Sequence, residues 1–204
     1  MTRTCGDETI DAGRHGTPGV YAFFANHVLG ANESCLDVGG GLGIGFDILR
    51  RKSLQVRSID LDPRLAQMDV ERGDVRHEAD GAYDWVVAVD VVEHVEEDEE
   101  FIQNLWRVAR KGVFVSSPNL DHHPDRIWPF HVREYTALHF KTLCQKGCPG
   151  AKIHHFGSEV YGGHLTYCHL GAQWEHQEIL ALKQPNYLLG LTLYLRDVAM
   201  KILR

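Results

Sequence analysis

The sequence predicts an α/β fold built on a parallel β-sheet with helices on both faces. Between residues 35 and 116, short apolar segments alternate with segments whose apolar residues recur at helical spacing. The segment from Tyr83 to Val92 is β-branched and almost continuously apolar, which is typical of a strand buried in a parallel sheet. A run of glycines over 39–45 follows one apolar segment and precedes a helical one. Such alternation indicates βαβ units.

Length, composition and charge are those of an ordinary globular protein. The 204 residues suit one domain, and 44% of them are hydrophobic and 24% charged. Lys and Arg number 21 against 28 Asp and Glu, so the net charge of −7 argues against a surface built mainly to neutralise phosphates. No apolar run reaches the roughly eighteen residues of a membrane span, and the polar N-terminus lacks a signal-peptide core. Five cysteines without disulfide-framework spacing predict a cytoplasmic location.

The first part of the chain supplies the alternating elements. Pro18 opens a helix that we expect to reach Leu29. The following strands are expected at 35–38, 55–60, 83–92 and 112–116, and the helices at 44–51, after Pro63, and at 96–110. The helix at 96–110 has acids in its first turn and bases in its last, which suits the helix dipole.

The last third of the chain departs from this alternation. We expect a helix over 132–144, strands over 151–159 and 164–171, and a helix over 185–204. The two strands are separated by Tyr161-Gly162-Gly163, which is typical of a hairpin turn.

The glycine run Gly39-Gly40-Gly41-Leu42-Gly43-Ile44-Gly45 is the most informative segment. It lies where a parallel strand ends, at the sheet edge that binds ligands, and glycine lets the backbone approach a ligand closely. The dinucleotide motif G-x-G-x-x-G fails, because its third glycine falls at Ile44 or Phe46. No Lys-Ser/Thr pair follows, which excludes a P-loop. We expect Gly40 and Gly45 to serve packing or turns rather than ligand contact.

Acidic residues follow the neighbouring strands. Asp60 ends the strand after the glycine loop, where a carboxylate accepts hydrogen bonds from the hydroxyls of a ribose. Asp74 follows a glycine in the next connection, Asp90 ends the apolar strand, and Val92-Glu93-His94-Val95 comes directly afterwards. Structural roles are expected for three other acids: Asp62 as a cap, Asp84 in a pair or cap at a strand start, and Glu93 solvated or in a local pair.

Six segments within residues 30–145 combine these features: LDVGGGLG, SIDLD, GDV, YDWVVAVDVVEHV, GVFVSSPN and HVREYT. Their order and spacing resemble class I S-adenosylmethionine-dependent methyltransferases, in the group that acts on small molecules. The resemblance implies a Rossmann-like, seven-stranded, mostly parallel sheet with an antiparallel last strand and helices on both faces. It implies a single methyltransferase domain over 1–204, comprising an N-terminal helical cap (1–30), a cofactor-binding core (31–145), and C-terminal strands and a helix (146–204).

The resemblance also implies S-adenosylmethionine as cofactor, with S-adenosylhomocysteine as its product, and a role for each motif. The implied cofactor residues are Asp37, Gly39 and Gly41 at the methionine end, Asp60 at the ribose hydroxyls, Leu61, Asp74 and Val75 at the adenine, and Asp90 near the sulfonium. Contacts at the methionine end are expected to come largely from the backbone.

A hydroxyl acceptor must lose its proton, and histidine is the usual base near neutral pH. We expect at least one of His94, His123 and His131 to touch the acceptor in this catalytic role. His94 follows the apolar strand, whereas the other two lie in the 118–135 loop, where aromatic residues alternate with polar ones.

No metal site is expected. Cys144 and Cys148 with His154 or His155 have the ligand types of a structural zinc site, but their spacing lacks a zinc-knuckle turn. Metal assistance at His122-His123-Pro124-Asp125 is the other, less favoured interpretation.

The acceptor is expected to be a small molecule with a hydroxyl oxygen, such as a sugar, a natural product or a lipid-like intermediate. The alternatives are N-methylation of a small amine or protein side chain, and a non-catalytic methyltransferase-like subunit. Nucleic acid is disfavoured, because Asp90-Val91-Val92-Glu93-His94 stands where amino-methylating enzymes of DNA and RNA carry Asp/Asn-Pro-Pro-aromatic. The 185–204 helix is expected to dock on the protein or to form a homodimer interface, with peripheral membrane contact as the alternative.

Overall fold

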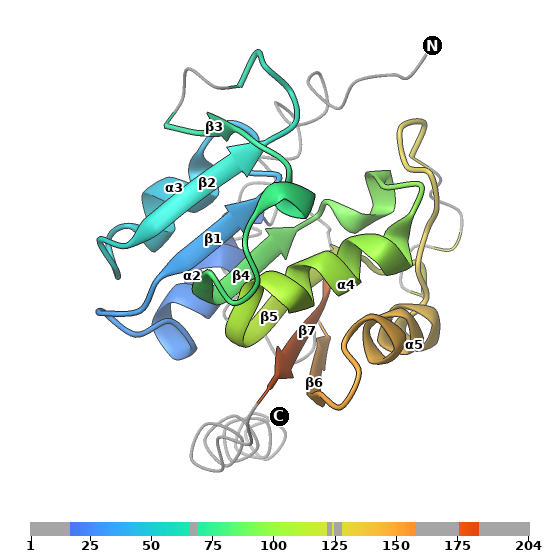
Figure 1. The fold of residues 1–204 in the computed structure, drawn as a ribbon. Helices are drawn as coiled ribbons and strands as arrows, with labels where there is room; N and C mark the ends of the chain where they lie inside the picture. The colour runs from blue at the N-terminus through green and yellow to red at the C-terminus, as the bar shows by residue number, and fades with distance from the viewer. Residues whose placement is uncertain (1–16, 66–68, 122–123, 125–127, 158–175, 184–204) are drawn as a thin grey trace, which may run out of the picture.

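The computed structural model describes residues 17–65, 69–121, 124, 128–157 and 176–183. Seven strands form one twisted sheet in the order β3-β2-β1-β4-β5-β7-β6 (Figure 1). Their bounds are Cys35–Val38 (β1), Val56–Asp60 (β2), Glu71–Arg72 (β3), Tyr83–Val89 (β4), Ala109–Pro118 (β5), Lys152–Gly157 (β6) and His176–Leu182 (β7). No helix among these residues is long and apolar enough to cross a membrane.

The strand pairing confirms a mostly parallel sheet with an antiparallel last strand. β1 to β5 run parallel, with Leu36 beside Arg57 of β2 on one side and beside Val86 of β4 on the other. β7 is antiparallel to both β5 and β6, between which it lies. All parallel strands therefore end at one edge of the sheet, and their following loops meet there.

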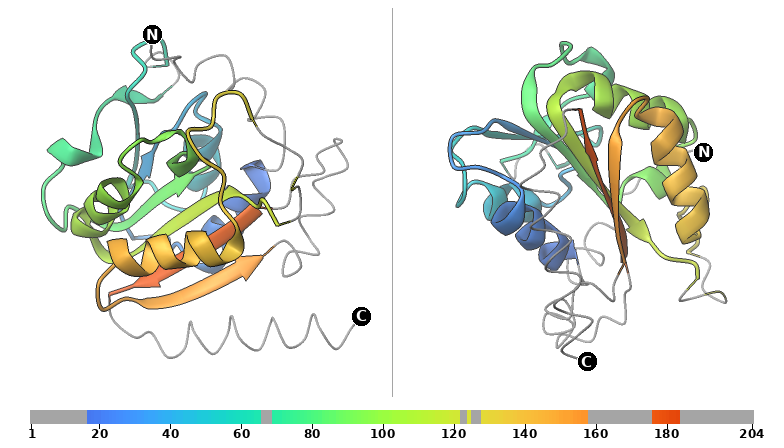
Figure 2. Two further views of the ribbon diagram at one scale, coloured as in Figure 1. Left: turned by 90° about the vertical axis from the view of Figure 1, so that its right-hand side faces the viewer. Right: turned by 90° about the horizontal axis from the view of Figure 1, so that it is seen from below.

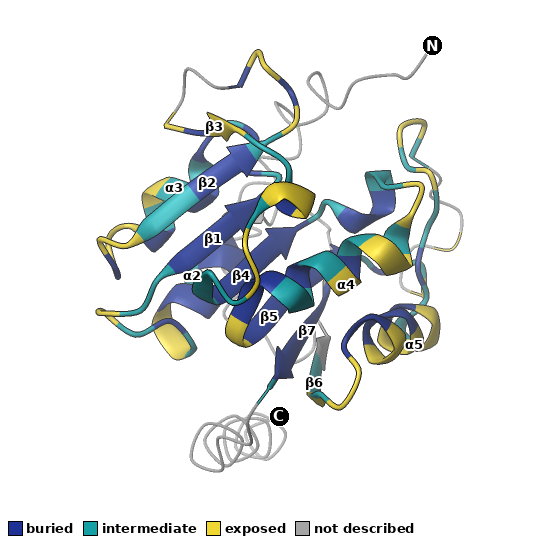
Figure 3. Cartoon of the chain, in the orientation of Figure 1, coloured by how far each residue is buried: buried dark blue, intermediate teal, exposed yellow. Residues whose placement is uncertain are grey.

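Helices cover both faces of the sheet, as Figure 2 shows in its end-on view. Helices α2 (Thr17–His27) and α3 (Ile44–Leu49) pack on one face, and α4 (Asp98–Val108) and α5 (Ala137–Gly147) on the other. Alternate side chains of β4 pack into hydrophobic cores on the two faces of the sheet: Trp85 and Val87 lie on the side of α2, whereas Val86 and Ala88 lie on the side of α4. Strand β1 and most of β4 and β5 are accordingly buried, whereas β3 is exposed, and the helices expose their outer sides (Figure 3).

Several element bounds differ from the sequence-based expectation. The apolar strand ends at Val89 rather than Val92, because Asp90 takes a left-handed conformation with φ of 56° and the chain turns into a short 3-10 helix, η2 (Val92–His94). The helix expected over 96–110 spans Asp98–Val108, and β5 begins directly at Ala109. Pro63 lies in a turn, where Asp62 Oδ1 accepts a 2.9 Å hydrogen bond from the Arg64 amide.

The C-terminal third shows larger differences. The helix expected over 132–144 begins at Ala137, because the side chain of Thr136 accepts a hydrogen bond from the His139 amide and so caps it. The neighbour of β6 in the sheet is β7 at His176–Leu182, a segment that the periodicity did not indicate. The expected strand over 164–171 and the expected helix over 185–204 lie outside the described residues.

Candidate functional site

The glycine loop is held in a conformation that requires glycine. Gly39, Gly41 and Gly43 have φ of 75°, 53° and 78°, the left-handed region that side chains disfavour. A Cβ on Gly39 would lie 2.5 Å from Cγ2 of Val91, which follows β4. The loop after β1 therefore touches the loop after β4, so the residues that follow these two strands share one site.

Gly40 and Gly45 serve packing, as expected. A Cβ on Gly40 would meet the Ser58 hydroxyl at 1.9 Å, and one on Gly45 would meet the Tyr21 ring at 2.3 Å. Both glycines therefore let buried side chains support the loop from beneath.

Asp37 lies under the glycine loop rather than facing an open site. It is fully buried, and its two oxygens accept hydrogen bonds from Tyr21 Oη at 2.7 Å and Ser58 Oγ at 2.8 Å. Burial raises the pKa of its carboxyl to about 6, although the two hydrogen bonds oppose the rise. The side chain thus braces the loop, which agrees with an expected contact to a cofactor through the backbone.

Asp60 connects the loops after β1 and β2. Its Oδ2 accepts a 3.0 Å hydrogen bond from the Gly41 amide, and its Oδ1 accepts one of 2.9 Å from the Asp62 amide. Each carboxylate oxygen can accept a second hydrogen bond. The geometry leaves Asp60 able to accept from the two hydroxyls of a ribose while it fixes the position of the glycine loop.

The expected adenine residues differ in exposure. Leu61 is 67% exposed beside Asp60, which leaves its side chain available to a planar ring. Val75 is 4% exposed and packs in the core, so its backbone is what it can offer. Asp74 caps a 3-10 turn and is paired with Arg76, whose NH2 lies 2.6 Å from Oδ2 and lowers the pKa of the carboxyl.

Asp90 lies at the end of β4 in a strained conformation. The Ser116 hydroxyl on the adjacent strand β5 donates a 2.8 Å hydrogen bond to Oδ1, and the Asp90 amide donates to the same hydroxyl at 3.2 Å. This double contact holds a non-glycine residue at positive φ, a feature concentrated at functional sites.

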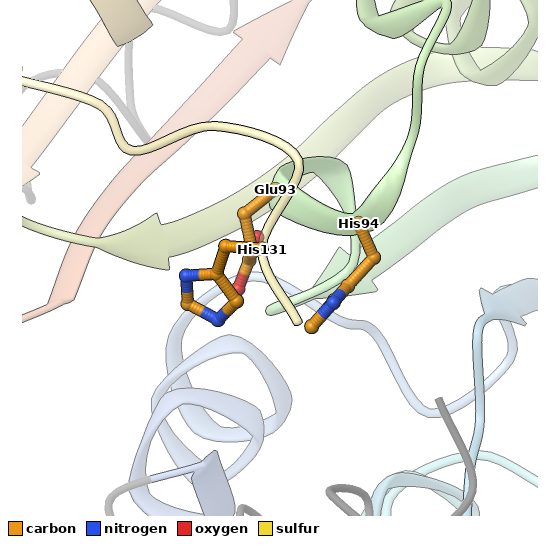
Figure 4. A group of neighbouring side chains, drawn as sticks. All are labelled: Glu93, His94 and His131. Carbon is orange, nitrogen blue, oxygen red and sulfur yellow. The ribbon is translucent and has the colours of Figure 1, made fainter. Parts of the chain in front are cut away.

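His94 and His131 meet beside this turn, although 37 positions separate them in the sequence (Figure 4). Their ring centroids lie 4.8 Å apart in an edge-to-face arrangement. His131 Nδ1 lies 2.8 Å from Glu134 Oε1, and both side chains are nearly buried. Burial, followed by the neighbouring His131, lowers the pKa of His94, so its neutral form is favoured. Two of the three predicted catalytic histidines therefore come together, whereas His123 lies outside the described residues.

Glu93 overturns the expectation of a solvated or locally paired acid. It is 1% exposed, and neither carboxylate oxygen has a hydrogen-bond partner among the described residues. The backbone explains the burial, because the amide of Val132 donates a 2.7 Å hydrogen bond to the carbonyl of Glu93 and places the 128–135 segment over it. Burial and the nearby Asp90 raise the pKa of Glu93; the Ser117 hydroxyl offsets part of the rise without reaching hydrogen-bonding geometry.

Sequence reasoning missed three supporting side chains: Tyr21, Ser116 and Glu134. Tyr21 falls among the apolar positions of its helix and Ser116 within an apolar strand, so neither has a signal of its own. Glu134 has such a signal, because it lies three residues after His131. The segment was expected to start a helix, so the signal was not used. Cys144 and Cys148 are buried and are not part of a metal-ligand group in the described part of the chain.

Comparisons with known proteins agree with this geometry. Residues 36–116 match the family described as "Methyltransferase domain". A probable S-adenosylmethionine-dependent methyltransferase of Mycolicibacterium smegmatis is 30% identical over 131 residues, which cover 56% of this chain and 51% of that protein. The chain thus spans about half the length of the curated relatives it matches.

Solved structures share the fold at low sequence identity. A chain from the complex between the Haloferax volcanii Trm112 methyltransferase activator and a methyltransferase has a TM-score of 0.65 and 12% identity, covering 89% of this chain and 96% of that chain. The [4+2]-cyclase SpnF has a TM-score of 0.64 and 16% identity, covering 81% and 80%. The family match, the curated relatives and the fold support a class I S-adenosylmethionine-dependent methyltransferase.

Proposed function

We propose that this protein transfers the methyl group of S-adenosylmethionine to a hydroxyl oxygen of a small-molecule acceptor. The observation that carries the proposal is the contact between Gly39 and Val91, which brings the glycine loop against the turn that leads to His94. A cofactor whose methionine end lies on that loop has its methyl group close to the histidine pair.

The carboxyl edge of the sheet supplies the parts of a cofactor site. Asp60 accepts from the ribose, Leu61 covers the adenine, and the glycine loop offers amides to the methionine end. Asp74 takes the adenine amino group while Arg76 keeps its pKa low. The acids Asp37 and Asp90 favour a cationic sulfonium by electrostatic attraction.

The reaction is an in-line displacement. The S–CH3 bond breaks as the acceptor O–CH3 bond forms, and the acceptor O–H bond gives up its proton; the products are a methyl ether, S-adenosylhomocysteine and a proton. Alignment of donor and acceptor supplies much of the acceleration. We assign removal of the proton to the site formed by His94 and His131, where Glu134 holds the second ring in one orientation.

An amine acceptor is the second candidate, favoured by the carboxylates around the site. Carboxylates alone can orient an amine acceptor, whereas a hydroxyl acceptor needs a base such as the histidine pair. The buried contact between His131 and Glu134 therefore favours a hydroxyl oxygen as the acceptor atom. The described cysteines, Cys35, Cys144 and Cys148, are free thiols and support a cytoplasmic location.

Binding of S-adenosylhomocysteine to purified protein tests the cofactor site. We expect Asp60→Asn to weaken binding by roughly tenfold to a hundredfold, because ribose hydroxyls lose a charged acceptor worth about 1.5–3 kcal/mol. Asp80→Asn is the matched control, because Asp80 is exposed before β4, at the opposite end of that strand. Equal affinity in wild type and Asp60→Asn, or preference for NAD, would contradict the site.

A further inference from the structure

Beside the proposed cofactor site, Glu93, His94 and His131 converge on one point. Glu93 and His94 come from the η2 turn, and His131 comes from the segment that crosses over it (Figure 4). One potential ligand atom from each lies within 4.8 Å of the other two, a grouping found nowhere else in the described part of the chain. We propose that these three residues form a binding site for a divalent transition-metal ion.

The Glu93 carboxylate gives independent support. Both of its oxygens are buried without a hydrogen-bond partner among the described residues. A carboxyl group buried without a hydrogen-bond partner is costly in its charged form, so it is either protonated or met by a cation. A metal ion held together with the two histidine rings satisfies both the charge and the lone pairs of the carboxylate.

The histidine rings are oriented as metal ligands are. Glu134 occupies Nδ1 of His131 at 2.8 Å, which leaves Nε2 as the nitrogen for an ion. The carbonyl of Phe130 lies 3.3 Å from Nδ1 of His94. A carboxylate or backbone carbonyl on the second ring nitrogen is the usual support of a metal-bound histidine, because it fixes the tautomer and the ring plane.

The ligand types select the ion. Two imidazoles and one carboxylate suit Zn²⁺, Fe²⁺ and neighbouring first-row ions, whereas Mg²⁺ and Ca²⁺ prefer oxygen alone. Ligand atoms around tetrahedral Zn²⁺ lie about 3.3 Å apart, so side-chain shifts on the order of 1 Å close the site. Three protein ligands leave at least one coordination position open, as in catalytic rather than structural sites.

This inference deepens the proposed function and rests on it for its chemical role. An ion at this place would bind the acceptor oxygen through the open position and lower the pKa of the hydroxyl, so that its proton would pass to water and the histidines would act as ligands rather than as the proton acceptor. The acceptor class narrows to molecules whose hydroxyl oxygen can coordinate a metal ion.

The cofactor's own sulfonium is the competing cation for Glu93. A sulfonium is not coordinated by imidazole nitrogen as a metal ion is, so this alternative does not explain why His94 and His131 converge with Glu93. Under this alternative, Glu93→Gln weakens the binding of S-adenosylmethionine more than that of S-adenosylhomocysteine, which lacks the sulfonium charge, and it does not change metal binding.

The test is metal binding by tag-free full-length protein, stripped with a chelator and dialysed. Isothermal titration with Zn²⁺ at about pH 7.5 gives stoichiometry and affinity. Visible absorption of added Co²⁺ gives a spectroscopic signature independent of activity. The variants are Glu93→Gln, His94→Gln and His131→Gln, with His139→Gln as the control, because His139 is exposed on α5.

We expect one Zn²⁺ per chain in the wild type and in His139→Gln, and affinity at least tenfold weaker in the three site variants. If Glu93→Gln does not fold, the two histidine variants decide. No stoichiometric binding, or binding unchanged in the site variants, overturns the metal site. A separate titration uses S-adenosylhomocysteine. If the protein binds S-adenosylhomocysteine but not Zn²⁺, only the metal site is overturned. If it binds Zn²⁺ but not S-adenosylhomocysteine, only the proposed function is overturned.

Discussion

The hydroxyl of Tyr21 donates a 2.7 Å hydrogen bond to Asp37, and this bond joins the N-terminal helix α2 to the strand that carries the glycine loop. Asp37 is fully buried and Tyr21 is 3% exposed, so water cannot replace the bond. The same tyrosine ring rests against Gly45 at the start of α3. Helix α2 therefore supports the glycine loop directly.

Loss of this hydroxyl should destabilise the protein while the ring packing persists. We expect Tyr21→Phe to lower the free energy of unfolding by roughly 1–3 kcal/mol, because a buried acceptor loses its donor. Urea unfolding monitored by circular dichroism measures the change. Tyr83→Phe is the control, since its hydroxyl bonds Arg57 in a half-buried position and should cost less.

Asp37 should make stability depend on pH in a narrow window. Its pKa is raised to about 6 in the folded protein from an ordinary 3.8. Between these values the folded state holds a proton that the unfolded state has released, so this group's contribution falls as pH rises from about 4 to 6. The loss is on the order of 3 kcal/mol at most.

Asp37→Asn removes that titration but keeps the shape. We expect the difference in unfolding free energy between wild type and variant, without cofactor, to change over pH 4–6 and to flatten above about 6. Parallel stability curves through this window would show that Asp37 does not have a raised pKa.

A methyl group on Gly45 should displace the Tyr21 ring. We expect Gly45→Ala to destabilise the protein by about 1–3 kcal/mol, the cost of overpacking a core, and to weaken S-adenosylhomocysteine binding. Gly150→Ala is the comparison, because its φ of 74° carries backbone strain but a Cβ there meets nothing within 4 Å. Thermal melts with and without ligand separate the two effects, and loss of ligand response in Gly150→Ala would argue against a local cause.

Glu134 should tune metal affinity without being a ligand. We expect Glu134→Gln to weaken Zn²⁺ binding by about tenfold to a hundredfold, because the amide fixes the His131 ring less firmly than the carboxylate does. Competition against a chelator of known affinity measures this. An equal loss in Glu78→Gln, whose side chain pairs with Arg57 away from the site, would indicate a non-specific effect.

The sequence predicted the parts of this molecule that are governed by local pattern. Cys35–Val38 was located to the residue, because a short apolar run meets a glycine run that can only turn. The acids at 60 and 90 follow from the same rule, since parallel strands end at a common edge. Gly40 and Gly45 were expected to serve packing or turns, and both lie against buried side chains.

The parts that failed depend on contacts distant in sequence. Glu93 lies close to the acidic run 96–100 and looks solvated until the backbone of Val132 covers it. The strand β7 begins with His176, Gln177 and Glu178, polar residues whose strand character comes from pairing with β5 and β6. The start of α5 was missed for a local reason: the apolar spacing continues through Val132, whereas the Thr136 side chain caps the helix three residues before His139.

The position of β7 also sets the order in which the molecule can be completed during synthesis. β5 and β6 are not neighbours in the sheet; each pairs with β7 instead, and β7 comes after both in the chain. Until residue 182 has left the ribosome, β5 has one unpaired edge and β6 lacks its neighbour β7, and unpaired edges invite pairing with other chains. The nascent protein therefore contains all five parallel strands, and the loops that follow them, before its sheet can be completed.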